Sequence, residues 1–145
     1  MHWLGYTLAL LASVLWGLTY CLDERVLAGL SVMRLYFLHC LCGTVIAGAI
    51  LLAQGQAPAS LVRLDAAGAG RGLVALTLVT ATTAALCILG SIQLLGAHRS
   101  AVLEISYPLF VALFSMLFFH GRLEPPVLVG GGFILVGAAI VVLTS

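Results

Sequence analysis

Long apolar stretches recur along this chain, and their length matches what a membrane crossing requires. A helix needs about 20 apolar residues to cross about 30 Å of hydrocarbon. Stretches of this kind cover residues 3–22, 32–53, 72–95, 100–119 and 127–143. They do not alternate between polar and apolar residues with a period of two, which argues against a membrane β-barrel. The sequence therefore predicts an all-α, polytopic membrane helix bundle of about five transmembrane helices (four to five), forming one domain over residues 1–145.

The composition supports the same class. Hydrophobic residues make up 63% of the chain and charged residues only 8%, whereas a soluble domain carries roughly 25% Asp, Glu, Lys and Arg. The net charge of +1 offers no surface that would attract a nucleic acid. The four cysteines lie in apolar runs without a CxxC pair, so we expect them to fill space rather than form disulfides or hold a cofactor.

The segments between the apolar stretches are short, with one exception. The charged triplet at residues 23–25 is expected to form a loop, and His98 with Arg99 is expected to mark a tight turn. Residues 54–71 form the single long connection, and the proline-containing segment 120–126 reads as a turn. The N-terminus lacks the basic region of a signal peptide, so we expect a retained first span.

The arginines give little information about orientation. Five crossings place the two ends on opposite sides of the membrane, and the positive-inside rule compares the arginines of the loops on each side. The balance slightly favours a cytoplasmic N-terminus and is compatible with copies that insert both ways. With the N-terminus inside, the inner loops hold Arg63, Arg71 and Arg122, and Arg25, Arg34 and Arg99 lie on the outer side.

The fourth apolar stretch contains a carboxylate and a proline in the sequence VLEISYPLF. A charged side chain at the centre of a membrane helix costs roughly 2.5–3.5 kcal/mol, so Glu104 needs an explanation. Pro108 has no N–H to bond the carbonyl of Glu104, and a kink in the helix is expected there. Ser100 and Tyr107 are spaced four and three residues from Glu104, which predicts a polar stripe on one helix face.

Two interpretations of Glu104 remain open. The carboxylate either lies near the membrane surface and pairs with Arg99, or it faces a cavity and binds a proton or a cation. Interrupted membrane helices are typical of transporter binding sites, which favours the second interpretation.

Three further residues are candidates for binding a solute. Trp16 and Tyr20 share a face of the first span and form either an interfacial aromatic belt or a surface that contacts substrate. Arg34 begins the second span and is either a snorkelling anchor or the partner of an anionic group.

Other polar residues in the spans indicate no chemistry. His39 and Cys42 are too few to form a metal site, which needs three or four ligands. Thr80, Thr83, Cys87 and Ser91 form one stripe of the third span, and its hydroxyls are expected either to bond to their own helix backbone or to line a polar cavity. The sequence contains no recognisable nucleophile–base pair or phosphate loop, so we do not expect an enzyme.

Small residues are frequent in the spans. Gly130 and Gly137 lie seven residues apart on one face of the last span. Small residues let membrane helices approach closely, so this face serves either packing within the bundle or a dimer interface.

The sequence resembles the EamA domain of the drug/metabolite transporter superfamily. The similar segments are LLASVLWGLTY in the first span, MRLYFLHC in the second, and HRSAVLEISYPLFVALFSMLFFHGRL with VGGGFILVGAAIVV in the last third. Two positions depart from the family pattern. Gly121 stands where the family has a Glu before the arginine, and Tyr107 stands where an acidic residue often precedes the proline.

The resemblance implies a transporter built from one five-helix repeat. Typical members resemble two such repeats in opposite orientations, so we expect a homodimer, antiparallel in one arrangement, or a heterodimer with a sister chain. The expected protein lies in a plasma membrane, in the bacterial inner membrane for example, and moves a small organic solute by proton-coupled alternating access. The alternative is a lipid-carrier flippase-like or accessory subunit, in which Arg34 or Arg122 meets a phosphate.

Overall fold

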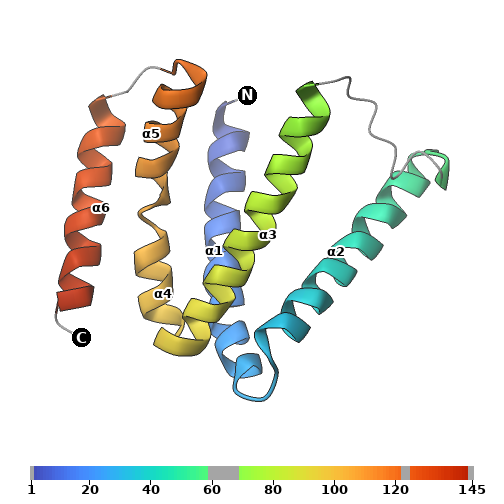
Figure 1. Cartoon of the computed structure of the whole chain (residues 1–145), viewed down its shortest axis with the longest axis horizontal. Coiled ribbons are helices and arrows are strands. Elements are labelled where there is room, and N and C mark those ends of the chain that lie inside the picture. Colours follow the sequence, from blue (N-terminus) through green and yellow to red (C-terminus); the bar gives the residue numbers. More distant parts are fainter. Residues whose placement is uncertain (1, 59–68, 122–124, 144–145) are drawn as a thin grey trace. The chain divides into compact units, whose positions relative to one another are not determined.

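The computed structural model describes residues 2–58, 69–121 and 125–143, and these residues form α-helices without any strand. Five segments of the described chain are long and apolar enough to cross a membrane, with α4 and α5 together forming the fourth. The predicted all-α membrane class is therefore confirmed. The helices, labelled in Figure 1, are α1 (His2–Leu27), α2 (Val32–Ala53), α3 (Ala69–Leu95), α4 (Ala97–Glu104), α5 (Tyr107–Phe119) and α6 (Pro125–Leu143).

Two turns lie elsewhere than predicted. The charged triplet at residues 23–25 is not a loop, because α1 continues through it to Leu27 and the chain turns at residues 28–31. Charged side chains at the end of a span leave the backbone bonds of the helix intact, so the helix runs on to Leu27, two residues before Gly29. His98 and Arg99 are not a turn either, since they lie in the first turn of α4. The turn is Gly96, whose φ of 84° is readily adopted only by glycine.

The fourth span is broken rather than bent at the proline. The sequence predicted one helix over residues 100–119 with a kink at Pro108, but α4 ends at Glu104 and α5 begins at Tyr107. The break occurs before the proline because Pro108 has no N–H to bond the carbonyl of Glu104 and its ring clashes with that carbonyl, whereas its fixed φ suits the first turn of a new helix. Ser106 lies in the break, where its hydroxyl donates to the carbonyl of Leu103 at 2.7 Å.

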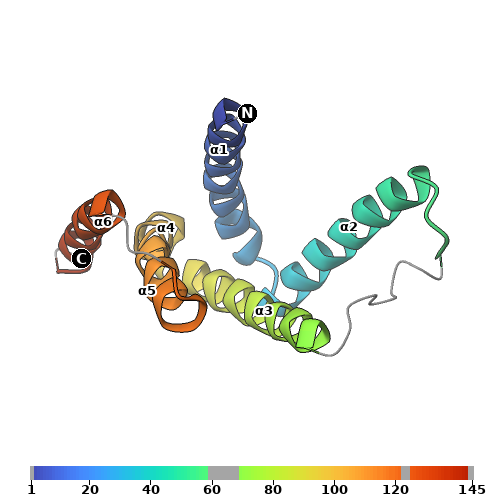
Figure 2. The same cartoon turned by 90° about the horizontal axis from the view of Figure 1, so that it is seen from above.

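The chain divides into two compact units, and the first contains residues 1–25 and 91–145. Within it, α6 packs against both α4 and α5 and runs antiparallel to them (Figure 1). Seen from above in Figure 2, α4 and α5 follow one another along nearly the same direction, with α6 at their side. At Gly131, α6 comes so close to α5 that a methyl group there would overlap the side chain of Leu109.

The second unit contains residues 26–90. Ser31 caps the start of α2, where its hydroxyl accepts a hydrogen bond from the backbone N–H of Arg34 at 3.4 Å. The hydroxyl of Tyr36 donates to the hydroxyl of Thr82 at 3.1 Å, which links α2 to α3. This side-chain contact places the two helices next to each other at that level.

Candidate functional site

The carboxylate of Glu104 has a specific partner on another helix. The hydroxyl of Tyr20, on α1, donates a hydrogen bond to Oε2 of Glu104, at the end of α4. Tyr20 is 7% exposed, so its ring is packed within the first unit while its hydroxyl reaches the acid. The two residues are 84 positions apart in the sequence. Because a hydrogen bond stabilises a charge that would otherwise be poorly solvated, this contact accounts for a carboxylate within a membrane-spanning segment.

The pairing bears on the two expectations for Glu104. The interfacial interpretation had Glu104 pair with Arg99, but these two described residues form no ion pair, and Arg99 is exposed in the first turn of α4. Glu104 is the eighth residue of the span Ala97–Phe119, so it lies about 10 Å along the helix axis from the start of the span. This geometry fits the binding interpretation better.

A second carboxylate of α1 contacts the other end of α4. Oε2 of Glu24 accepts a hydrogen bond from the backbone N–H of Ala97 at 3.2 Å. Gly96, the residue before α4, has no side chain with which to cap this helix end. A methyl group at Gly96 would come to 3.2 Å from Oε1 of Glu24, a tight contact that glycine avoids, and the φ of 84° also favours glycine here. Glu24 therefore supplies the cap that α4 lacks in its own sequence.

Serines link α4 to the end of α3. The hydroxyls of Ser91 and Ser100 lie 2.8 Å apart, and Ser100 is completely buried. The residues of the predicted polar stripe therefore have different partners. Ser100 contacts Ser91 on α3, whereas Glu104 accepts a hydrogen bond from Tyr20 on α1. Of the hydroxyls predicted along the third span, Thr80 and Thr83 bond to carbonyls of their own helix, as one of the two expectations for this stripe stated.

Trp16 and Tyr20 form an aromatic pair beside the acid. Their ring centroids are 6.1 Å apart with the planes tilted by 47°. Trp16 is 60% exposed, in contrast to Tyr20. The ring of Tyr20 is therefore packed and its hydroxyl is bonded to Glu104, whereas the ring of Trp16, one helical turn away, is exposed.

Tyr107 and Pro108 lie beyond the helix break. Tyr107 is the first residue of α5 and is 59% exposed, and Pro108 occupies the first turn of that helix. The structure thus separates Tyr107 from the helix that carries Ser100 and Glu104. Among the described residues, the Tyr107 side chain makes no hydrogen bond to either of them, and its role in binding stays a prediction.

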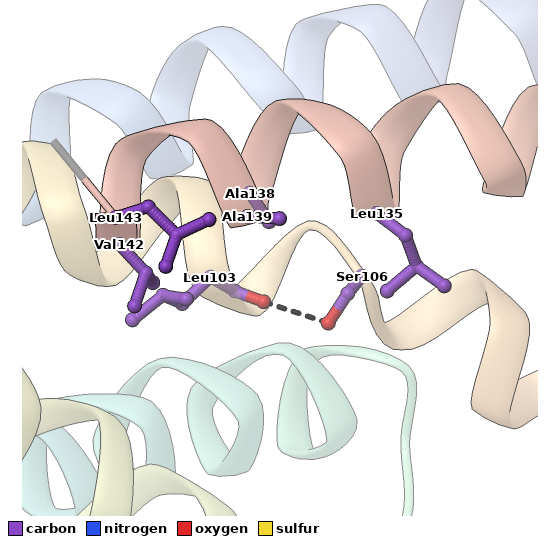
Figure 3. Close-up of a pocket in the computed structure, with 7 residues that line it drawn as sticks. All are labelled: Leu103, Ser106, Leu135, Ala138, Ala139, Val142 and Leu143. Atoms are coloured by element: carbon purple, nitrogen blue, oxygen red, sulfur yellow. Dashed lines mark hydrogen bonds between the residues drawn. The ribbon is translucent and has the colours of Figure 1, made fainter.

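An apolar groove of about 380 Å³ lies beside the same break (Figure 3). Its lining is hydrocarbon except for the hydroxyl of Ser106, which is directed to the carbonyl of Leu103. Glu104 does not line it, so the groove accommodates an apolar group and not the acid's ligand. The lining residues are Leu103, Ser106, Leu135, Ala138, Ala139, Val142 and Leu143.

The remaining candidates belong to other parts of the chain. Arg34 belongs to the second unit, where it is exposed at the start of α2. Arg63 and Arg122 lie outside the residues that the structure describes. Among the described residues, no group of three or more His, Cys, Asp or Glu side chains is arranged to hold a metal ion.

Sequence reasoning missed one residue of the site. Glu24 was assigned to a loop, yet it lies on α1 one turn after Tyr20 and contacts α4. The spacing of Trp16, Tyr20 and Glu24, four residues each, was the available signal for a shared helix face. The signal was hidden because the loop was assumed to begin at the first charged residue.

Comparison with models of protein families gives a match that covers nearly the whole chain. The model of the EamA-like transporter family matches residues 3–143. No curated protein and no solved structure gives a significant match to the chain.

Proposed function

Because the chain belongs to the EamA-like transporter family, we propose that it is a transporter subunit that moves a small organic solute across a membrane by alternating access. The family is one of membrane transporters of the drug/metabolite type, and the five apolar segments make the chain a multi-pass membrane protein. The proposal adds three points: the coupling ion is the proton, the active form is a dimer, and the membrane is a plasma membrane.

The single observation that carries the proposal is the bond between Tyr20 and Glu104. A carboxylate within a membrane span is costly, and such residues commonly mark ion pathways. A carboxyl group held by one neutral hydroxyl can exchange that partner for a proton or for a cationic ligand. Glu104 is therefore proposed as the group that binds either the proton or the solute, which would couple their movements.

The neighbouring aromatic residues support a ligand with a positive charge. Trp16 presents an exposed indole ring next to Tyr20, whose hydroxyl contacts Glu104. A cation is attracted to the face of such a ring, and the attraction grows where water is excluded. An aromatic surface beside a carboxylate thus suits an organic cation better than an anionic metabolite.

The break between α4 and α5 supports a conformational cycle. Discontinuous helices near the middle of a membrane are where many secondary transporters bind their substrates. Ile105 and Ser106 separate two short helices here, and Glu104 is the last residue before them. A small change of backbone at this point would change the direction of the carboxylate without unfolding either helix.

Unused small-residue surfaces support the dimer. A methyl group added at Gly130 or Gly137 of α6 would meet no atom within 4 Å. Glycines with open space above them allow a second helix to approach closely.

A second copy in the opposite orientation is compatible with the balanced arginines of the sequence. The orientation is tested by labelling Gly29→Cys and Gln56→Cys variants from each side of the membrane. Equal labelling of each cysteine from both sides supports an antiparallel pair, whereas labelling from one side alone contradicts it.

The proposal is tested with purified protein in liposomes. Uptake of an aromatic organic cation, tetraphenylphosphonium, is followed with and without a pH gradient, for the native chain and for Glu104→Gln. We expect the gradient to drive uptake by the native protein and to have no effect on the variant. The Cys87→Ser variant, altered at an exposed position of α3, serves as the control. Gradient-driven uptake by Glu104→Gln at the native rate contradicts the role of Glu104.

A further inference from the structure

We propose that Glu24 is a positioning residue for Glu104: by capping α4 from α1, it sets where the carboxylate of Glu104 lies against Tyr20. The inference rests on the proposed function, in which Glu104 binds the proton or the cation. It concerns a residue that takes no part in that binding itself.

The first step is the contact at the start of α4. The first N–H groups of a helix have no partner within the helix, and Gly96 provides no capping side chain for them. Glu24 accepts the N–H of Ala97, the first residue of α4, at 3.2 Å. A carboxylate at this position also interacts favourably with the positive end of the helix dipole. The start of α4 is therefore bonded to α1.

The second step is the contact at the other end. Glu104, the last residue of α4, accepts the hydroxyl of Tyr20. Tyr20 and Glu24 lie one turn apart on α1, so they share a face of that helix. Both ends of α4 are thus attached to one face of α1, and the two contacts depend on each other through the rigid helix between them.

The third step is that α4 is interrupted on both sides. Gly96, with its positive φ, separates α4 from α3, and Ile105 with Ser106 separates it from α5. A helix of eight residues between two breaks is not held in place by a continuing helix. Its position therefore depends on its own contacts, which are the packing against α6, the bonds to Glu24 and Tyr20, and the contact of the buried Ser100 with Ser91.

Together these observations assign Glu24 its role. Loss of the cap would remove the bond between α1 and the N–H of Ala97, and the start of α4 would be held only by the contact of Ser100 with Ser91 and by packing against α6. The helix would then hold Glu104 less firmly against Tyr20, and the carboxyl group would take up and release its proton at a different pH. Packing of side chains cannot replace the cap, because it supplies no hydrogen-bond acceptor for the N–H of Ala97.

The structural part of the inference is tested by a distance between spin labels on α1 and α4. One label is placed at the native Cys21 and one at Arg99→Cys, both at exposed positions, after Cys40, Cys42 and Cys87 are replaced by serine. With Glu24 present we expect one narrow distance distribution. We expect Glu24→Ala to broaden it, and Glu24→Gln to preserve it largely, because the amide oxygen also accepts a hydrogen bond.

The functional part uses the pH profile of cation uptake in liposomes. We expect Glu24→Ala to move the midpoint of the profile and Glu24→Gln to restore most of it. In a Glu104→Gln background, Glu24→Ala should produce no further change in the profile, as expected for two residues that act through one group. Arg25→Ala, altered at the adjacent exposed residue, is the control and should leave the profile unchanged.

The outcomes separate this inference from the proposed function. A native distance distribution and a native profile in Glu24→Ala overturn the inference, as does an equal loss of rate at every pH. If Glu104→Gln retains gradient-driven uptake, the proposed function fails, and the positioning role fails with it even where the labels show that Glu24 holds α4. A broadened distribution with a moved midpoint, restored by Glu24→Gln, supports both.

Discussion

At the scale of single residues, two contacts explain how a carboxylate is kept in an apolar span. Tyr20 and Glu24 are spaced by one helical turn on α1 and contact opposite ends of α4. Neither contact joins residues that are close in the sequence. The sequence therefore shows that a carboxylate at position 104 is unfavourable in an apolar span. Only the fold shows that the hydrogen bond from Tyr20 offsets this cost.

Removing the hydroxyl of Tyr20 should weaken function more than folding. In Tyr20→Phe the ring still packs, whereas Glu104 loses its donor. A hydrogen bond between membrane helices contributes about 0.6 kcal/mol on average and about 1.7 kcal/mol at most, so we expect a small loss of thermal stability. Gradient-driven uptake should fall by roughly tenfold, as expected when about 1.4 kcal/mol of the interaction that positions Glu104 for its ligand is lost. Tyr6→Phe, at an exposed tyrosine of the same helix, should behave as the native protein, and equal rates for both variants would contradict the role of Tyr20.

At the scale of helices, the sequence predicted where the helices lie better than where they end. The five apolar stretches correspond to the described helices because hydrocarbon requires backbone bonds to be satisfied within each segment. The ends were missed where charge was equated with a loop, at residues 23–25, and where Pro108 was taken as a kink rather than as a helix start. Glu24 was missed because it was placed in that loop. Its partner Ala97 is also 73 residues away in the sequence, so the contact depends on the fold.

Glycines of α6 should differ in their tolerance of a methyl group. At Gly131 the methyl would overlap the side chain of Leu109, whereas at Gly132 it would meet no atom within 4 Å. Alanine in a helix is favoured over glycine by roughly 0.5–1 kcal/mol, so Gly132→Ala should retain or gain stability. Gly131→Ala should lose stability because α6 must move away from α5. Thermal unfolding in detergent measures both, and equal unfolding temperatures would show that α5 and α6 do not approach closely.

At the scale of the whole molecule, the chain exposes far more apolar surface than it buries. In each of the five candidate spans at most 11% of the most apolar window is buried. Lipid tails cover such surface whatever its side chains, whereas glycines on the surface matter only where another helix approaches closely. The open positions at Gly130 and Gly137 are therefore the best candidates for contact with a second copy, which supports the proposed dimer.

A larger side chain on this glycine face should separate the copies. We expect Gly137→Leu to lower the dimer fraction in detergent, because helices that meet at glycines cannot approach over a leucine. Chemical cross-linking or mass photometry measures the fraction. Val136→Leu, at the neighbouring exposed position, is the matched control. A native dimer fraction in Gly137→Leu would exclude this face from the interface.

The central claim is that the carboxyl group of Glu104 carries the proton that a solute displaces. The most direct test is the release of protons when tetraphenylphosphonium is added to purified, weakly buffered protein. We predict release by the native protein and none by Glu104→Gln. Proton release of native size from Glu104→Gln would contradict the account.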